Sequence, residues 1–142
     1  MEWLKATIDY GIIGFLILMS IVCLTIAIEK HLFFKRITLD HYSDRRLLEI
    51  DLIRKINIIA TIGSNAPYIG LLGTVLGIML TFYTMGNLGA MDPAKMMVGL
   101  ALALKATAVG LLVAIPAVVF NNFLLGKARL LMIEWEMKNE KQ

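Results

Sequence analysis

Three long apolar stretches that contain almost no charged residue constrain the fold of this chain more than any other feature. Residues 11–28 and 56–91 have no charged side chain, and residues 96–126 have only Lys105. With 58% apolar and only 18% charged residues, the 142-residue chain lacks the polar surface of a soluble domain. A helix needs about 20 apolar residues to cross the roughly 30 Å hydrocarbon core of a membrane. The sequence therefore predicts an all-α integral membrane protein, a single domain over residues 1–142, with transmembrane helices at about 10–28, 65–87 and 95–120.

The first apolar stretch also has the length of a secretory signal peptide, which is removed from mature proteins. Only Lys5 precedes it as a basic residue, and no small-residue cleavage site follows before Glu29. We therefore expect a retained membrane anchor.

The distribution of basic residues predicts the orientation of the chain, because lysine and arginine accumulate on the cytoplasmic side of a membrane. Seven of them lie between the first two spans and four in the C-terminal tail, against only Lys5 and Lys95 on the opposite side. We expect an external N-terminus, a cytoplasmic loop at residues 29–60 and a cytoplasmic tail at residues 123–142. The net charge of +3 then reflects topology, and we expect no nucleic-acid partner.

Helical patterns extend beyond the apolar stretches on the cytoplasmic side. The segment LLEIDLIRKINII, residues 47–59, has apolar residues three and four apart, and Ser43 or Asp44 is placed to cap its start. We expect this helix to continue into the second span, and the tail to prolong the third, so that both long helices extend into the cytoplasm. Between them, the turn at residues 87–93 makes the two helices antiparallel neighbours, with Pro93 in the first turn of the third.

Small residues are spaced three or four apart along one face of the second and third helices. They are Gly63, Gly70, Gly73 and Gly77, followed by Gly99, Ala103, Ala106, Gly110, Ala114 and Ala117. In lipid, helices associate through close backbone contact at such residues. Packing within one chain accounts for part of this pattern, but two such faces in three helices also indicate an oligomer. Pro67 and Pro116 lie inside the same helices, where we expect helix breaks that are structural or line a cavity.

Two threonines are the candidate functional residues of these helices. Thr74 and Thr107 lie equally far from the turn, so in antiparallel neighbours they reach the same depth and can form a polar ring. The alternative is that each hydroxyl bonds to its own helix backbone and has no further role.

Lys105 is the one charged residue within the third apolar stretch, where an unpaired charge costs a few kcal/mol. At about 100° per residue, it points roughly 160° away from Thr107, so the two side chains do not face one pore. Lys105 either extends outward to the membrane surface or has an electrostatic function. No Asp or Glu lies in residues 56–91 or 96–126, so a proton pathway needs a carboxylate from another chain.

Other reactive side chains form no pattern with a chemical function. Cys23 is the only cysteine and lies in the first span, while His31 and His41 lack metal-ligand spacing. The chain shows no nucleophile–base set and no phosphate-binding loop. We expect neither an enzyme nor a cofactor or metal site.

Two motifs resemble the ExbB/TolQ/MotA proton-channel family. They are ATIGSNAPYIGLLGTVLGIMLTF at residues 60–82 and ALALKATAVGLLVAIPAVVFNN at residues 101–122, which follow the family patterns APxxGLxGTVxGI and ATAxGLxxAIPAVxxYN. The motifs occur in family order and cover about a third of the chain. Within the family, the sequence looks most like the ExbB branch.

The resemblance implies a subunit of a proton-driven motor in the bacterial inner membrane, with a periplasmic N-terminus and a cytoplasmic C-terminus. Family members form a ring, a pentamer in ExbB-like complexes, whose second and third helices line a lumen. An ExbD-like partner would bring titrating aspartates into that lumen, and a TonB-like partner would carry the output to outer-membrane import. By motif position, Thr74 and Thr107 match the lumen threonines of the family.

The sequence departs from the family pattern in the third helix, and it also fits other functions. The glutamate of the family's third helix corresponds to Leu102, and the nearest charge is Lys105, three residues on. A TolQ-like role in outer-membrane maintenance and a passive membrane scaffold both fit the sequence. The MotA stator fits less well, because we see neither its fourth span nor its large charged loop.

Overall fold

The computed structural model describes residues 2–89 and 92–140, and most of these residues are helical. The elements follow in the order α1 (Glu2–Arg36), the short 3-10 helix η1 (Leu39–His41), α2 (Arg45–Ile53), α3 (Ile56–Leu88) and α4 (Pro93–Glu140). No strand occurs in the described part of the chain. The predicted all-α class is therefore confirmed.

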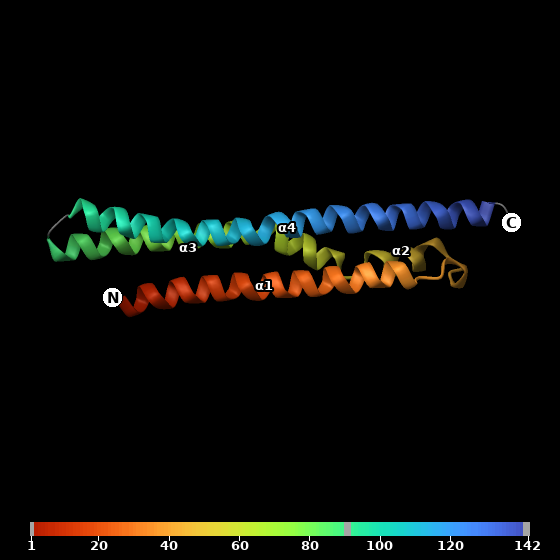
Figure 1. Cartoon of the computed structure of the whole chain (residues 1–142), viewed down its shortest axis with the longest axis horizontal. Coiled ribbons are helices and arrows are strands. Elements are labelled where there is room, and N and C mark those ends of the chain that lie inside the picture. The colour runs from red at the N-terminus through yellow and green to blue at the C-terminus, as the bar shows by residue number, and fades with distance from the viewer. Residues whose placement is uncertain (1, 90–91, 141–142) are drawn as a thin grey trace.

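Three long helices lie side by side in an elongated bundle (Figure 1). Helices α1 and α4 run in the same direction and α3 runs opposite to them, while α2 folds back along the C-terminal part of α4. The interface between α3 and α4 is the most extensive, and α1 packs against both. By length and composition, α1, α3 and α4 are each able to cross a membrane, as the apolar stretches predict.

Helix α4 is one continuous helix of 48 residues, which corresponds to a length of about 72 Å. This is more than twice the roughly 30 Å thickness of a hydrocarbon core, so α4 projects beyond it. The tail does prolong the third span, as predicted. The expected helix breaks do not end either helix, since α3 continues through Pro67 and α4 through Pro116. Each proline removes one backbone donor without stopping the helix.

The predicted continuous rod from the loop helix into the second span is wrong. Helix α2 ends at Ile53 and α3 begins at Ile56, because Lys55 adopts a left-handed backbone conformation with φ 70°. Leu48 and Leu52 are fully buried, and α2 packs against α4. The start of α2 is as predicted, since the Asp44 side chain accepts a hydrogen bond from the Arg46 amide at 3.0 Å.

The turn between α3 and α4 begins and ends with residues suited to it. Gly89 follows α3 with φ 66°, a conformation that favours glycine. Pro93 is the first residue of α4, and the Asp92 side chain accepts a hydrogen bond from the Ala94 amide at 3.1 Å. Residues 90 and 91 of the predicted turn lie outside the described residues.

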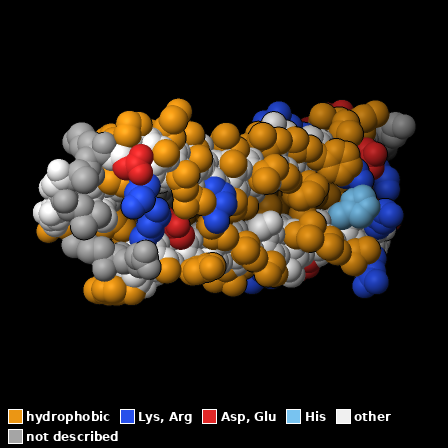
Figure 2. Space-filling view, turned by 60° about the vertical axis from the view of Figure 1, so that its left-hand side comes forward, with side chains coloured by type: hydrophobic (Ala, Val, Ile, Leu, Met, Phe, Trp, Pro, Cys, Tyr) orange, Lys and Arg blue, Asp and Glu red, His pale blue; other side chains and the backbone are white. Residues whose placement is uncertain are grey.

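Most of the apolar surface of the three long helices is left exposed by the chain itself. Within the most apolar window of each long helix, 22%, 39% and 33% of the residues of α1, α3 and α4 are buried. Figure 2 shows one face on which hydrophobic side chains predominate, with a group of Lys, Arg and His side chains at its right-hand end and fewer charged side chains elsewhere. Apolar faces of this extent require lipid or another protein to cover them.

Candidate functional site

The contact between α3 and α4 is so close that it depends on glycine. A Cβ atom placed on Gly70 would lie 2.7 Å from the backbone oxygen of Ala106, and one on Gly110 would lie 2.8 Å from that of Ala66. Backbone atoms cannot move aside at such distances without separating the helices. The two helices therefore meet backbone to backbone in the middle of the bundle.

The other predicted small residues also pack within this one chain. A Cβ on Gly73 would meet the Ala106 side chain at 2.7 Å, and one on Gly77 would meet Ala103 at 2.9 Å. The small faces of α3 and α4 thus cover each other. Because these small residues pack within one chain, they do not by themselves indicate an oligomer, contrary to our inference from the sequence. The argument for association with other chains rests instead on the exposed apolar surface of the long helices.

Thr74 lies buried at this interface, with 6% of its surface exposed. Its hydroxyl lies 3.3 Å from the Gly70 carbonyl of its own helix and 3.0 Å from the Ala103 carbonyl of α4. It is also hydrogen-bonded to the hydroxyl of Thr107. Because a hydroxyl has one proton, Thr74 donates to one carbonyl at a time and can accept from Thr107.

Thr74 and Thr107 therefore come together at the same depth, as their distances from the turn predict. Thr107 is half-buried, so its hydroxyl extends the polar contact from the interface towards the surface of the pair of helices. Neither hydroxyl titrates near neutral pH, but both can donate to or accept from a neighbouring group. The arrangement can solvate a protonated or charged partner but cannot itself act as the titrating acid.

Lys105 lies on a different side of α4. Its side chain is exposed, as are those of Leu102 and Leu112, and no ion pair or hydrogen bond within the described residues involves it. Thr107 faces α3, so the predicted divergence of Lys105 from Thr107 is confirmed. Its functional role stays a prediction.

Two further polar residues of these helices were not identified from the sequence. Thr81 is buried one heptad after Thr74, donates to the Gly77 carbonyl at 2.8 Å and packs on Gly99. The heptad spacing from Thr74 was a usable signal for its burial. Asn121 has a buried side-chain oxygen without a partner in the described structure, and its position in the sequence gave no comparable signal.

A second polar cluster joins the segment after η1 to α2 and α4, at the opposite end of the bundle from the α3–α4 turn. The Tyr42 hydroxyl donates to the Asp51 carboxylate at 2.7 Å, and the Trp135 indole donates to the Tyr42 carbonyl at 3.0 Å. Burial, together with the hydrogen bond to Asp51, raises the pKa of Tyr42 to about 12. The sequence did not reveal this cluster, because its members are far apart along the chain.

The described residues contain no group of His, Cys, Asp and Glu side chains able to hold a metal ion. Cys23 is a free cysteine buried between the helices.

Comparisons with known proteins point to one family. Residues 25–137 match the MotA/TolQ/ExbB proton channel family. The chain is 54% identical over 134 residues to a putative biopolymer transport protein ExbB-like 2 of Helicobacter pylori, an alignment that covers 94% of this chain and 89% of that protein. It is 51% identical over 136 residues to the biopolymer transport protein ExbB of Aquifex aeolicus, covering 96% and 92% of the two chains. It is also 43% identical over 74 residues to the Tol-Pal system protein TolQ of Pseudomonas aeruginosa, covering 52% and 32%.

Proposed function

Because the chain belongs to the MotA/TolQ/ExbB proton channel family, we propose that it is the ExbB-like subunit of an inner-membrane motor driven by the proton motive force. With an ExbD-like partner, this motor energises TonB-dependent import across the outer membrane. The observation that carries the proposal is the hydroxyl pair of Thr74 and Thr107, held between the apolar stretches of α3 and α4, residues 56–91 and 96–126, which contain no carboxylate.

The proposed assembly is a homo-pentameric ring in which α3 and α4 line a lumen. The exposed apolar surface of the three long helices supports association with further chains and with lipid. Eleven lysine and arginine residues lie in residues 29–60 and 123–142, against only Lys5 and Lys95 on the opposite side, which supports a cytoplasmic position for both segments and a periplasmic N-terminus.

In this proposal the titrating acid comes from the partner. An aspartate in a dry lumen strongly prefers the neutral form, and its charged form needs hydroxyl donors, water or a cation nearby. The hydroxyls of Thr74 and Thr107 supply such donors at a fixed depth. Each proton that crosses a potential of 100 mV releases about 2.3 kcal/mol, which is sufficient for a stepwise motor if the path is well sealed.

The decisive experiment removes each hydroxyl while keeping the shape of the side chain. Thr74→Val and Thr107→Val, co-expressed with the ExbD-like partner and reconstituted in vesicles, should lower proton flux at least tenfold. Native mass spectrometry should find the same number of subunits as in the wild type. Thr25→Val is the matched control, because Thr25 is exposed on α1 and bonds only to its own helix at Ile21.

If the chain is only a passive scaffold, Thr74→Val and Thr107→Val should leave the proton flux of the reconstituted complex unchanged. Unchanged flux in Thr74→Val and Thr107→Val would therefore overturn the proposed proton pathway. A TolQ-like role in outer-membrane maintenance is the alternative within the family, and the TolQ match supports it over half of the chain. Deletion of the gene distinguishes the two roles. Loss of an ExbB-like subunit should impair receptor-dependent uptake, whereas loss of a TolQ-like subunit should impair outer-membrane integrity.

A further inference from the structure

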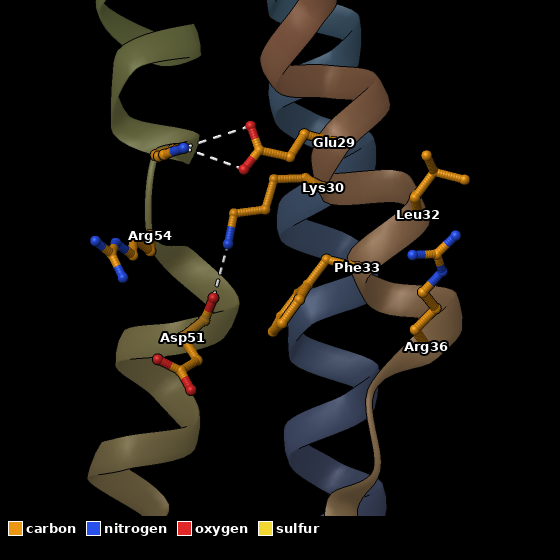
Figure 3. Close-up of a pocket in the computed structure, with 8 residues that line it drawn as sticks. Glu29, Lys30, Leu32, Phe33, Arg36, Asp51 and Arg54 are labelled. Carbon is orange, nitrogen blue, oxygen red and sulfur yellow. Dashed lines mark hydrogen bonds and ion pairs between the residues drawn. The ribbon is translucent and has the colours of Figure 1, made fainter.

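A pocket of about 600 Å³ opens between α1 and the junction of α2 with α3 (Figure 3). Lys30 and Phe33 of α1 line one side, and Asp51, Arg54 and Lys55 line the other. The pocket lies beside α1 at the break between α2 and α3, where Arg54 and Lys55 interrupt the helix (Figure 3). Four basic and two acidic side chains line it in total.

Lys30 is the unusual residue of this pocket, because its charged side chain is only 6% exposed. Its ammonium donates to the backbone carbonyl of Asp51 at 2.7 Å and lies 4.8 Å from the centre of the Phe33 ring. The carbonyl belongs to the last turn of α2, so Lys30 also caps that helix. An ammonium has three donors, and this contact uses one of them.

Asp51 and Glu29 lie near Lys30, but neither carboxylate forms an ion pair with it. Glu29 is paired with Lys55 at 3.0 Å, and the Asp51 carboxylate accepts from the Tyr42 hydroxyl and is turned away from the ammonium in Figure 3. No ion pair within the described residues includes Lys30. A buried charge without a direct ion-pair partner is costly, so an anion in the pocket would stabilise this arrangement.

The position of Lys30 along α1 places the pocket at the boundary of a membrane. The uncharged stretch of α1 at residues 11–28 has a length of about 27 Å, close to the thickness of a hydrocarbon core. Lys30 follows two residues later and thus lies at the level of the lipid head groups. Arg36 and Arg54, both exposed, stand on either side of the opening.

We propose that this pocket binds the phosphate group of an anionic phospholipid head, with the Lys30 ammonium at its base. The unused donors of Lys30 point to an oxyanion, and the depth of the pocket favours a lipid as its source over free phosphate. Basic pockets between membrane helices are suited to anionic head groups. Leu32 and Phe33 give the glycerol and the first acyl carbons an apolar wall. The inference does not depend on proton transport.

Lipid binding can be measured directly by native mass spectrometry in detergent. The probes are short-chain phosphatidylglycerol, short-chain phosphatidylcholine and inorganic phosphate, each titrated against the full chain. We expect tighter binding of phosphatidylglycerol than of the other two, and a loss of about tenfold or more in Lys30→Met. Arg54→Met should give a smaller loss, and because Arg54 is exposed, this variant does not put folding at risk.

Lys35→Met is the matched control, because Lys35 lies on the same helix at a similar level but does not line the pocket. Phosphatidylglycerol binding by Lys35→Met should stay within about twofold of the wild type, because this variant loses the same charge as Lys30→Met but outside the pocket. Equal binding by Lys30→Met and the wild type would overturn the proposal, as would an equal loss in Lys35→Met. Tight binding of inorganic phosphate without binding of phosphatidylglycerol would overturn the assignment to lipid.

Discussion

Gly70 of α3 and Gly110 of α4 face each other so closely that a Cβ atom on Gly110 would lie 3.0 Å from the Cα atom of Gly70. The same Cβ would lie 2.8 Å from the Ala66 carbonyl oxygen. This approach brings the helix backbones together one turn from Thr74 and lets its hydroxyl reach a carbonyl of the opposite helix. The glycines thus position the threonine pair as well as packing the helices.

Adding a methyl group at either glycine should separate the helices. We expect Gly70→Ala and Gly110→Ala each to lower the free energy of unfolding by about 1–3 kcal/mol, because the new atom meets backbone and the core cannot rearrange locally. Denaturation followed by circular dichroism in detergent measures the change. Gly14→Ala is the control, since nothing lies within 4 Å of the added Cβ and alanine favours the helix. Equal effects at Gly14 and Gly70 would contradict the close contact.

Gly99 and Thr81 should be energetically coupled. A Cβ on Gly99 would lie 2.6 Å from the methyl group of Thr81, so Gly99→Ala should destabilise the wild type by about 1–2 kcal/mol. In a Thr81→Ala background only the Cβ of residue 81 remains, at 3.2 Å from the added atom, and Gly99→Ala should cost much less. A double-mutant cycle measures a coupling of about 0.5–3 kcal/mol. Additive effects would mean that the two residues are not in contact.

The sequence was sufficient to predict those features that depend on position along one hairpin. The short turn fixes the register of α3 against α4, so equal distances from it were enough to pair Thr74 with Thr107. Apolar length was likewise enough to identify the three long helices. Both signals are local or follow from a short connection.

Features that depend on tertiary contacts were not predictable in this way. The helix break at Lys55 was missed, because lysine carries no preference for a left-handed conformation and the apolar pattern continues through it. The burial of Lys30 was missed for a similar reason, since its partner Asp51 lies 21 residues away on another helix. A charged residue at the end of an apolar stretch is ordinarily taken to be solvated.

The left-handed backbone of Lys55 gives a test of that helix break. Lys55→Gly removes the conformational cost, whereas Lys55→Val increases it, because a β-branched side chain adopts φ 70° poorly. Both variants lose the exposed ion pair with Glu29, so their difference isolates the backbone. We expect Lys55→Val to be less stable than Lys55→Gly by about 1–2 kcal/mol. Equal stabilities in thermal denaturation would show that Lys55 is not left-handed.

Tyr42 should titrate at a higher pH than an ordinary tyrosine. Its pKa in the folded chain is about 12, because burial and then the hydrogen bond to Asp51 favour the neutral phenol. Below pH ~10 both folded and unfolded chains hold this proton, and between pH ~10 and 12 only the folded chain does. Stability from this group is therefore present below pH ~10 and is lost as the pH rises towards 12.

Near-ultraviolet absorbance of tyrosinate measures this titration, with Tyr42→Phe subtracted to isolate the signal. Asp51→Asn should lower the pKa of Tyr42 only part of the way towards its ordinary value, since burial is the larger cause. Titration of Tyr42 at the ordinary pH in the wild type would contradict the buried hydrogen bond.

Lys105 tests whether a charge on the outer side of α4 contributes to function. It is exposed at mid-span and has no partner among the described residues, so Lys105→Met removes a charge without disturbing the packing within the chain. We expect normal assembly by native mass spectrometry, with proton flux through the reconstituted complex reduced by about tenfold, equivalent to ~1.4 kcal/mol. Lys105→Arg keeps the charge and should retain most of the proton flux. Lys95→Met removes an exposed charge near the N-terminal end of α4 and should have little effect on the flux. Normal flux in Lys105→Met would instead mean that the ammonium extends to the membrane surface, where its charge costs little and has no part in the proton pathway.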